Sequence, residues 1–247
     1  MSNQTILPND IAQFLRTQLS VQQYSATERG GIYRASNRPV ARLGLALEPF
    51  PRLPQWLVDN QIDALWLHRP WHLDMNTIPA NIGILHHHLP FDEHLTIGFN
   101  LRLAERLNAQ TPPEPLGFKQ ATDEAGMLLP PRPIGMLLSV PEGEFDAHLY
   151  KARDEFKGYD RAEMGRHPTI SRVAVVGAMT DALVREAANR GAQLYLTGQY
   201  RKPAQEAVNE VGIAVIALGH RRTEEWGLQA LATLIQAQWP ALTVMRH

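Results

Sequence analysis

The chain alternates between short apolar runs and longer segments in which apolar residues recur every three or four positions. The first pattern is typical of buried strands and the second of helices that bury one face. Residues 9–20 show the second pattern, with Ile11 and Leu15 on one face and Asn9 or Asp10 as the expected cap. The predicted helices are 9–20, 53–62, 100–108, 144–156, 180–191, 202–212 and 227–239, and the predicted strands are 42–49, 64–67, 82–89, 134–140, 172–179, 192–198 and 213–219.

Because strands alternate with helices throughout, the pattern predicts an α/β fold with mostly parallel sheets. A weak internal repeat supports it: the strand–helix–strand span from Arg42 to Leu67 recurs, with the same length, from Arg172 to Thr197. We therefore expect two similar, pseudo-symmetric α/β lobes with a cleft between them. The expected segments are a first lobe at 1–108, onto which C-terminal elements also pack, an inserted αβ segment at 109–168, which opens with a proline-rich loop at 110–133, and a second lobe at 169–247.

Composition narrows the class of protein. The chain has 247 residues, of which 44% are hydrophobic and 20% charged, and its formal net charge is −1, as in an ordinary soluble globular protein. This charge gives no sign of a nucleic-acid-binding surface. No apolar run is long enough for a membrane span, and the N-terminus lacks the pattern of a signal peptide. We expect a cytoplasmic protein with neither membrane nor nucleic acid as partner.

The chain has no cysteine, which excludes disulfides, thiolate zinc sites and iron–sulfur clusters. Any metal site must therefore use His, Asp and Glu. The chain has ten histidines, and more than half of them cluster in one short stretch, either around a metal site or as a surface cluster without a role. The clustered histidines are His68, His72, His86, His87, His88 and His94.

Histidines and carboxylates follow three of the predicted strands, in "LHRPWH", "HHHLPFD" and "GHRRTEE". His220 and Glu224 are four residues apart and share a face if the segment winds into the last helix. His88 and Asp92 have the same spacing, here expected across a turn because of Pro90. Each pair alone is more often a solvated surface pair or part of a turn. Together they offer nitrogen and oxygen ligands that suit Zn, Mn, Fe, Co or Ni better than Ca or Mg.

These motifs, in this order, resemble those of the Nif-three-like family, also called GTP cyclohydrolase 1 type 2 homologues. "WLHRP" is similar to the family's "VHHP"-like motif, and "HHHLPFDEHLTIGFNLRLAERL" to its central Asp motif. "YLTGQ" and "LGHRRTEEWGLQAL" resemble its late "TGE" and "GHxxTE" motifs. The resemblance covers most of the chain except the middle insertion.

The resemblance implies a two-lobed α/β protein that assembles as a toroidal homohexamer with divalent metal ions in each subunit's cleft. Carried over residue by residue, it implies that the metal ligands are His68, Asp92, His220 and Glu224, with His88 close by.

Two positions depart from the family pattern. Arg69 stands where the family has a second histidine, and Gln199 where it has the glutamate of "TGE". Arginine stays protonated and does not ligate a metal, so the number of ions is one, or two if another residue such as His72 substitutes. Arg69 either binds a phosphate or carboxylate of a substrate or pairs with Glu93 or Glu225.

Arg221 and Arg222 place further positive charge beside His220. With Arg69 they either form an anion-attracting mouth around the metal or pair with Glu224 and Glu225.

Three functions compete. The first is a metal-dependent hydrolase acting on a small anionic, phosphorylated or nucleotide-like, substrate, with Glu93 or Glu225 as base and Arg69 stabilising negative charge in the transition state. The second is a non-enzymatic metal-binding or scaffold ring with a degenerate site. The third, a nucleotide-binding regulator, has the weakest support because no phosphate-binding glycine loop is present.

Overall fold

The structure, a computed structural model, describes residues 5–247, which form two compact units with one β-sheet each. The first unit comprises residues 5–91, 121–129 and 227–247, and the second comprises 92–120 and 130–226. The predicted segments 1–108, 109–168 and 169–247 divide the chain at other residues. The α/β class with parallel strands at the centre of each sheet is confirmed.

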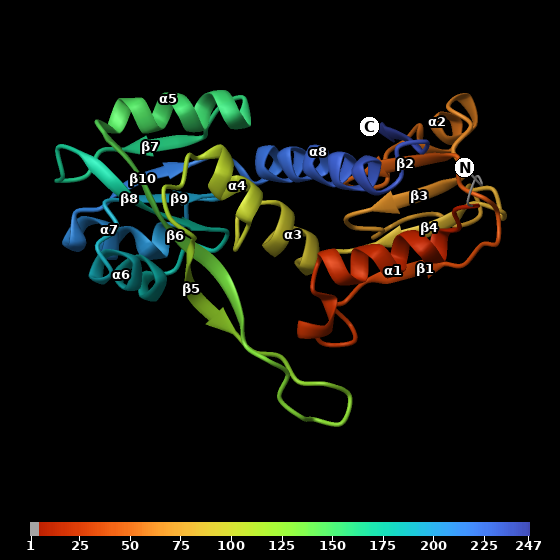
Figure 1. Cartoon of the computed structure of the whole chain (residues 1–247), viewed down its shortest axis with the longest axis horizontal. Coiled ribbons are helices and arrows are strands. Elements are labelled where there is room, and N and C mark those ends of the chain that lie inside the picture. Colours follow the sequence, from red (N-terminus) through yellow and green to blue (C-terminus); the bar gives the residue numbers. More distant parts are fainter. Residues whose placement is uncertain (1–4) are drawn as a thin grey trace. The chain divides into compact units, whose positions relative to one another are not determined.

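The first unit contains a five-stranded sheet in the order β1-β4-β3-β2-β11. All neighbouring strands are parallel except the edge strand β1, which is antiparallel to β4. Helix α1 packs against β1 and β4, and Figure 1 shows it beside these strands. The elements are α1 (Pro8–Gln18), the 3₁₀ turn η1 (Val21–Gln23), β1 (Gly31–Arg34), β2 (Arg42–Ala46), α2 (Leu53–Asp59), β3 (Ala64–Leu67), β4 (Gly83–His86) and β11 (Thr243–Arg246).

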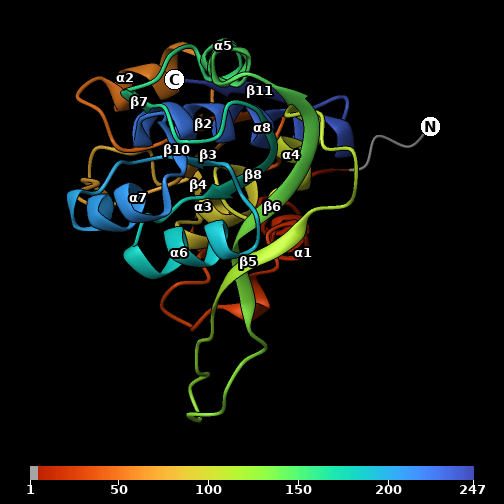
Figure 2. The ribbon, with the colours of Figure 1, turned by 90° about the vertical axis from the view of Figure 1, so that its left-hand side faces the viewer.

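The second unit contains a six-stranded sheet in the order β5-β6-β8-β9-β10-β7, in which only β8, β9 and β10 are mutually parallel. Helices α4 and α5 pack on one face of this sheet and α6 and α7 on the other (Figures 1 and 2). The elements are α4 (Leu101–Arg106), β5 (Glu114–Lys119), β6 (Arg132–Gly143), α5 (Phe145–Phe156), β7 (Arg161–Glu163), β8 (Ile170–Val176), α6 (Asp181–Asn189), β9 (Leu194–Thr197), η2 (Lys202–Ala204), α7 (Gln205–Val211) and β10 (Ala214–Ala217).

Two helices continue across the boundary between the units. They are α3 (Leu89–Leu95), which is separated from β4 by two residues, and α8 (His220–Gln238). No helix among residues 5–247 is both long enough and apolar enough to cross a membrane.

The repeat of span 42–67 in span 172–197 extends to individual hydrogen bonds. Oδ2 of Asp63 accepts the backbone N–H groups of residues 41 and 42, both at 2.9 Å. Oε1 of Gln193 accepts those of residues 171 and 172, also at 2.9 Å. In both spans the residue that precedes the second strand therefore fixes the start of the first strand.

The helix ends in the two spans also correspond. Gln61 and Gly191 both have positive φ, +53° and +83°, and each directly precedes the residue whose N–H closes the helix. Those closing bonds run from residue 62 to residue 57 and from residue 192 to residue 187. The pseudo-symmetry expected from the sequence is thus present in the backbone of both sheets.

Some predictions of where individual helices and strands lie were wrong. Helix α1 begins at Pro8, and Asp10 accepts the N–H of Leu7, so neither Asn9 nor Asp10 is the N-cap. The expected loop 110–133 contains β5, whose Pro115 is tolerated because β5 is an edge strand. Strands β1, β7 and β11 were not predicted, because they are edge strands without a fully buried residue and so lack an apolar run. Helix α3 was not predicted either.

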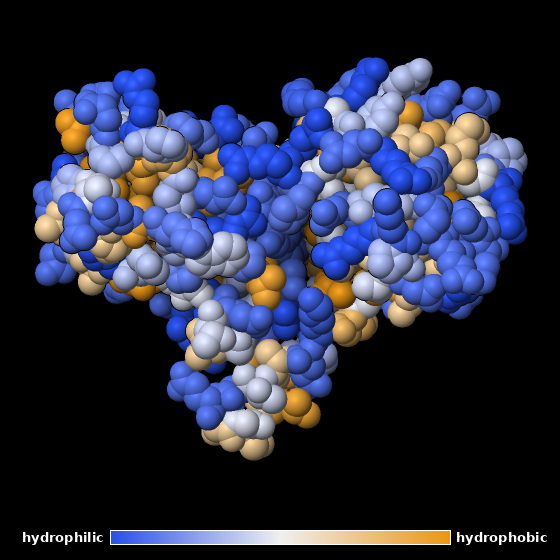
Figure 3. Space-filling model, turned by 180° about the vertical axis from the view of Figure 1, so that it is seen from behind, coloured by the Kyte–Doolittle hydropathy of each residue, from blue (hydrophilic) through white to orange (hydrophobic). Residues whose placement is uncertain are grey.

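The turn between β5 and β6 carries exposed apolar side chains. Met127 and Leu128 are 67% and 69% exposed. Figure 3 shows apolar groups interspersed with polar ones on this turn. Its backbone is held by Asp123, whose Oδ1 accepts the N–H groups of Ala125 and Met127.

Candidate metal site

His68 lies one residue beyond β3 and is fully buried. Its backbone N–H donates to the carbonyl of Ala46, which continues the β2–β3 ladder by one residue. Its ring Nδ1 lies 3.0 Å from the carbonyl oxygen of His87. Because a carbonyl only accepts, Nδ1 carries the proton and Nε2 is the nitrogen with the lone pair. A metal-ligating histidine typically has this arrangement, with one nitrogen held by a backbone carbonyl and the other presented to the ion.

His88 and Asp92 lie on the next segment of the chain. His88 directly precedes α3 and Asp92 is in its first turn. The sequence predicted a turn here because of Pro90, and this prediction was wrong. Pro90 is the second residue of the helix, where its missing N–H costs nothing. The spacing of four residues is therefore helical and places both side chains on one face.

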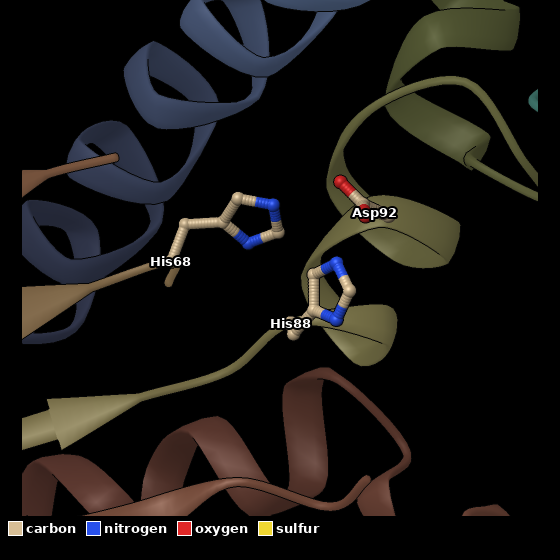
Figure 4. Close-up of side chains that lie close together, drawn as sticks. All are labelled: His68, His88 and Asp92. Carbon is tan, nitrogen blue, oxygen red and sulfur yellow. The ribbon is translucent and has the colours of Figure 1, made fainter. Parts of the chain in front are cut away.

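His68, His88 and Asp92 come together at the end of β3 and the start of α3. One potential ligand atom from each lies within 4.8 Å of the others. Figure 4 shows the two imidazole rings and the carboxylate converging from these two segments. Two imidazole nitrogens and one carboxylate oxygen fit a first-row divalent ion, and the donor set favours Zn, Mn, Fe, Co or Ni over Ca or Mg.

Aromatic side chains surround the two histidines. The ring of His68 lies 4.8 Å from that of Phe91 and 5.0 Å from that of His88. Trp71 meets His88 edge to face at 5.0 Å. These contacts limit the rotation of both imidazoles, so the potential ligands are held in place before an ion binds.

The other two histidines of the triplet are not part of this group. Burial, and then the charge of His86, lowers the pKa of His87 to about 3. Burial, and then the charge of His68, lowers the pKa of His86. Nδ1 of His87 accepts a hydrogen bond from Nε1–H of Trp66 at 3.0 Å. His87 is thus a neutral, buried residue whose backbone oxygen positions His68.

His220 is the first residue of α8 and Glu224 lies four residues further along it, as expected if "GHRRTEE" opens the last helix. Nε2 of His220 is 3.0 Å from Oε1 of Glu224. Glu224 is buried, whereas the side chain of His220 is 54% exposed. The pair offers one nitrogen and one carboxylate from one face of α8.

Arg69 pairs with Glu48, a partner that the sequence analysis did not consider. Its Nε and Nη2 atoms lie 2.9 Å and 2.6 Å from Oε1 of Glu48. Both residues line a cavity of about 650 Å³ in the first unit. His72, with a positive φ of +63°, also lines this cavity and is exposed there. The complete lining is Glu48, Pro49, Phe50, Pro51, Leu53, Pro54, Arg69, Trp71, His72, Leu73, Asp74 and Thr77.

Both residues expected to act as base have arginine partners. Glu93 is buried and makes a two-pronged ion pair with Arg132, at 2.7 Å and 3.3 Å. Glu225, 59% exposed, pairs with Arg221 one turn away on α8.

Arg222 pairs with Asp160 and also donates to the carbonyl of Leu218. The sequence alternatives for Arg221 and Arg222 were an anion-attracting mouth or pairs with neighbouring glutamates. The pair of Arg221 and Glu225 is present, and the partner of Arg222 comes from outside the helix.

Sequence reasoning missed Glu48 and Trp71. Trp71 matters because it contacts His88 and also lines the cavity, so it connects the group of potential ligands to a space that can hold a small molecule. The signal available was its position in "LHRPWH", an exposed tryptophan three residues after His68.

A family model described as Duf34/NIF3 (NGG1p interacting factor 3) matches residues 7–246. A protein of Neisseria meningitidis serogroup A named "GTP cyclohydrolase 1 type 2 homolog" is 31% identical over 189 residues, which cover 71% of each chain. The family match contains all the segments that carry the motifs, from "WLHRP" to "LGHRRTEEWGLQAL".

Solved structures share the fold at low sequence identity. A hypothetical protein of Staphylococcus aureus superposes with a TM-score of 0.74 at 12% identity, covering 99% of this chain and 97% of that one. A Bacillus cereus protein described as related to NIF3 gives a TM-score of 0.68 at 14% identity, with coverage of 99% and 97%.

Proposed function

The chain belongs to the Duf34/NIF3 family, and we propose that it is a divalent-metal-dependent hydrolase acting on a small anionic, phosphorylated or nucleotide-like, substrate. The observation that carries the proposal is the convergence of His68, His88 and Asp92 on one point. A bound divalent ion supplies the chemistry by lowering the pKa of a water ligand towards ~7.

The neighbouring cavity supports a small-molecule substrate. At about 650 Å³ it lies within the usual size range of small-molecule sites. Trp71, which is 57% exposed, and Phe50 offer aromatic surface, and the guanidinium of Arg69 lies 5.8 Å from the Trp71 ring. Arg69 would bind the anionic group of the substrate, exchanging part of its ion pair with Glu48 for a substrate oxygen.

His220 and Glu224 remain the predicted additional ligands, and Glu93 or Glu225 the predicted base. Glu225 is the more accessible of the two, because Glu93 is buried against Arg132. These roles rest on the sequence motif and are tested one residue at a time.

Metal content comes first. Elemental analysis of the purified chain, loaded separately with Zn, Mn and Fe, should give one or two ions per subunit. His88→Ala and Asp92→Asn should lose the ion, whereas His167→Ala, which removes an exposed loop histidine, should retain it. In His220→Ala, loss of one ion assigns α8 to the metal site, and unchanged content removes α8 from it.

Activity comes second. Hydrolysis of p-nitrophenyl phosphate, bis-p-nitrophenyl phosphate and nucleoside triphosphates should stop with EDTA and return with the ion that elemental analysis identifies. Hydrolysis that persists under chelation, or in His88→Ala, would contradict the proposal.

A non-enzymatic metal-binding role is the second candidate. The observation that favours it is the ion pair of Arg69 with Glu48, which already compensates the charge that a substrate anion would use. Stoichiometric metal without turnover of any probe, and with Arg69→Ala unchanged in metal content, would support this role over the hydrolase.

We also propose that the chain assembles as a homohexamer, which the family resemblance alone implies. Light scattering coupled to size-exclusion chromatography, on a chain of 27.7 kDa, distinguishes a hexamer from smaller assemblies.

A further inference from the structure

A second cavity in the first unit lies between one side of α1 and the turn that leads into β1. Its volume is about 230 Å³. In liquid water this volume holds roughly eight molecules, at ~30 Å³ each. Residues 9, 12, 13 and 16 of α1 face it at helical spacing, and residues 29–32 approach from the other side. The lining is Asn9, Ala12, Gln13, Arg16, Val21, Arg29, Gly30, Gly31, Ile32 and His87.

The cavity is rich in hydrogen-bond donors and has a positive charge. Two guanidinium groups, Arg16 and Arg29, line it, and no aspartate or glutamate does so among the residues that the structure describes. Nε of Arg29 donates to the carbonyl of Tyr24 at 3.0 Å, which fixes the plane of that guanidinium. The side-chain amides of Asn9 and Gln13 add further N–H groups.

The floor of the cavity is a buried imidazole whose proton position is determined by its neighbour. His87 is 1% exposed and lines the cavity. The indole Nε1–H of Trp66 only donates, so Nδ1 of His87, 3.0 Å away, must accept. In the neutral ring the proton is then on Nε2. The structure records no hydrogen-bond partner for Nε2 within residues 5–247.

The glycines at the start of β1 bring the backbone close to His87. Gly30 has a φ of +69°, and a Cβ there would lie 2.2 Å from the carbonyl oxygen of His86. A larger residue would push this turn away from the end of β4 and separate Arg29 from His87. The turn is therefore built to hold the arginine and the imidazole around one space.

We propose that this cavity binds the phosphate group of a small molecule, held by Arg16, Arg29 and Nε2–H of His87. Guanidinium groups match phosphate oxygens in geometry, and two of them balance the charge of a phosphate dianion. Because His87 lines the cavity, its Nε2–H can donate to a phosphate oxygen bound there. None of the three potential metal ligands lines this cavity, although the carbonyl of His87 holds the ring of His68. The proposal does not rest on the proposed hydrolase activity.

The first test is calorimetric titration of the full chain with inorganic phosphate, both as purified and after EDTA treatment, which removes any metal that could itself bind phosphate. We expect one phosphate per chain in both preparations. Arg16→Gln should weaken binding at least tenfold. Arg52→Gln is the matched control, because Arg52 is also exposed, belongs to the same unit and is not part of this cavity, and it should leave the affinity unchanged.

Arg16 is the preferred position because the structure records no hydrogen bond or ion pair of its side chain within residues 5–247, so its loss leaves folding intact. Equal affinity in Arg16→Gln and Arg52→Gln would overturn the proposal. Binding that disappears on chelation would also overturn it, because the phosphate would then be bound to the metal. Arg29→Gln should weaken binding as Arg16→Gln does.

The second test reads His87 directly by long-range ¹H–¹⁵N NMR of the imidazoles. His87 should appear as the Nε2–H tautomer, with its signal assigned by its disappearance in His87→Gln. Added phosphate should shift the Nε2 resonance in the parent chain, and the same shift in Arg16→Gln should need at least tenfold more phosphate. A His87 ring protonated on Nδ1, or an Nε2 signal unmoved at saturating phosphate, would contradict the site.

Discussion

The spans 42–67 and 172–197 have matching backbone structure but are followed by residues of different chemical type. Both run strand–helix–strand, and their strand registers match position by position, since Leu43 pairs with Ala64 and Val173 with Leu194. At the next position the first span has His68 and the second has Gly198. The repeated backbone therefore places one residue directly after each second strand. The type of that residue decides whether a potential ligand stands there: His68 offers an imidazole, and Gly198 offers no side chain.

The same comparison shows which features the fold itself requires. Asp63 and Gln193 differ in charge yet accept the same two backbone N–H groups, so the fold requires an acceptor and not a carboxylate. Gln61 and Gly191 differ in side chain yet share a left-handed backbone. Features that persist through such changes belong to the fold, and features present in one span alone are candidates for function.

The largest expected effect is on metal affinity, and it tests the difference between His68 and Gly198 at the ends of the two spans. His68→Ala should lower metal affinity at least ~100-fold, because it removes a ligand whose supporting contacts alone are typically worth 10–100-fold. Gly198→Ala should leave it unchanged, since an added Cβ lies 3.4 Å from Thr223 and fits with a small adjustment. Isothermal titration with Zn measures both. Equal affinities in the parent and His68→Ala would remove His68 from the site.

The next effect separates the two acceptors. Asp63→Ala should destabilise the first span by about 3 kcal/mol, because hydrogen bonds to a charged group are worth ~1.5–3 kcal/mol each. Gln193→Ala should destabilise the second by about 1–2 kcal/mol, because its two bonds are neutral. Hydrogen-exchange mass spectrometry on peptides from 42–67 and 172–197 measures each locally. A larger loss from Gln193→Ala would show that charge does not matter here.

A smaller effect tests the helix ends. Gln61→Gly should stabilise the first unit by up to ~1 kcal/mol, because a left-handed backbone strains every residue with a Cβ. Gly191→Gln should destabilise the second unit by a similar ~1 kcal/mol. Urea denaturation suits the first variant, because four of the five tryptophans, Trp56, Trp66, Trp71 and Trp239, lie in the first unit and report its unfolding. Shifts of the same sign in both variants would contradict the shared conformation.

The smallest expected effect is the acid response of the second unit, which lacks a buried histidine at its strand ends but has His148 on α5. Burial lowers the pKa of His148, while its hydrogen bond to the carbonyl of Ile170 opposes the shift. Because the folded pKa lies below the unfolded value near 6.5, the folded state binds fewer protons. The stability that His148 contributes is thus complete above pH 6.5 and is lost as the pH falls below it.

Urea midpoints of the parent chain should therefore fall more steeply between pH 6.5 and pH 5 than those of His148→Gln. His167→Gln, which alters an exposed histidine, is the control and should follow the parent. Identical pH profiles for the parent and His148→Gln would show that burial does not shift this group.

Long periodic elements and the repeat could be predicted from the sequence, since both depend on spacing along the chain. Residues 202–212, 227–239 and 172–179 correspond to α7, part of α8 and β8. The short elements could not, because a strand such as β11 has its pattern only in relation to its neighbour β2. Helix α3 was missed because Pro90 was interpreted as ending structure, although it is in the first turn, where proline is accepted.

The sequence alone determined the α/β repeat, the absence of thiol chemistry and the histidines and carboxylates after the strands as candidate ligands, because residue type and spacing are properties of the chain. The tertiary structure decided which of these candidates, His68, His88 and Asp92, lie within reach of one ion. The tertiary structure alone decided that Arg69 pairs with Glu48 and that Trp66 fixes the tautomer of His87. Those partners follow or belong to different strands, and only the register of β2, β3 and β4 brings them within hydrogen-bonding distance.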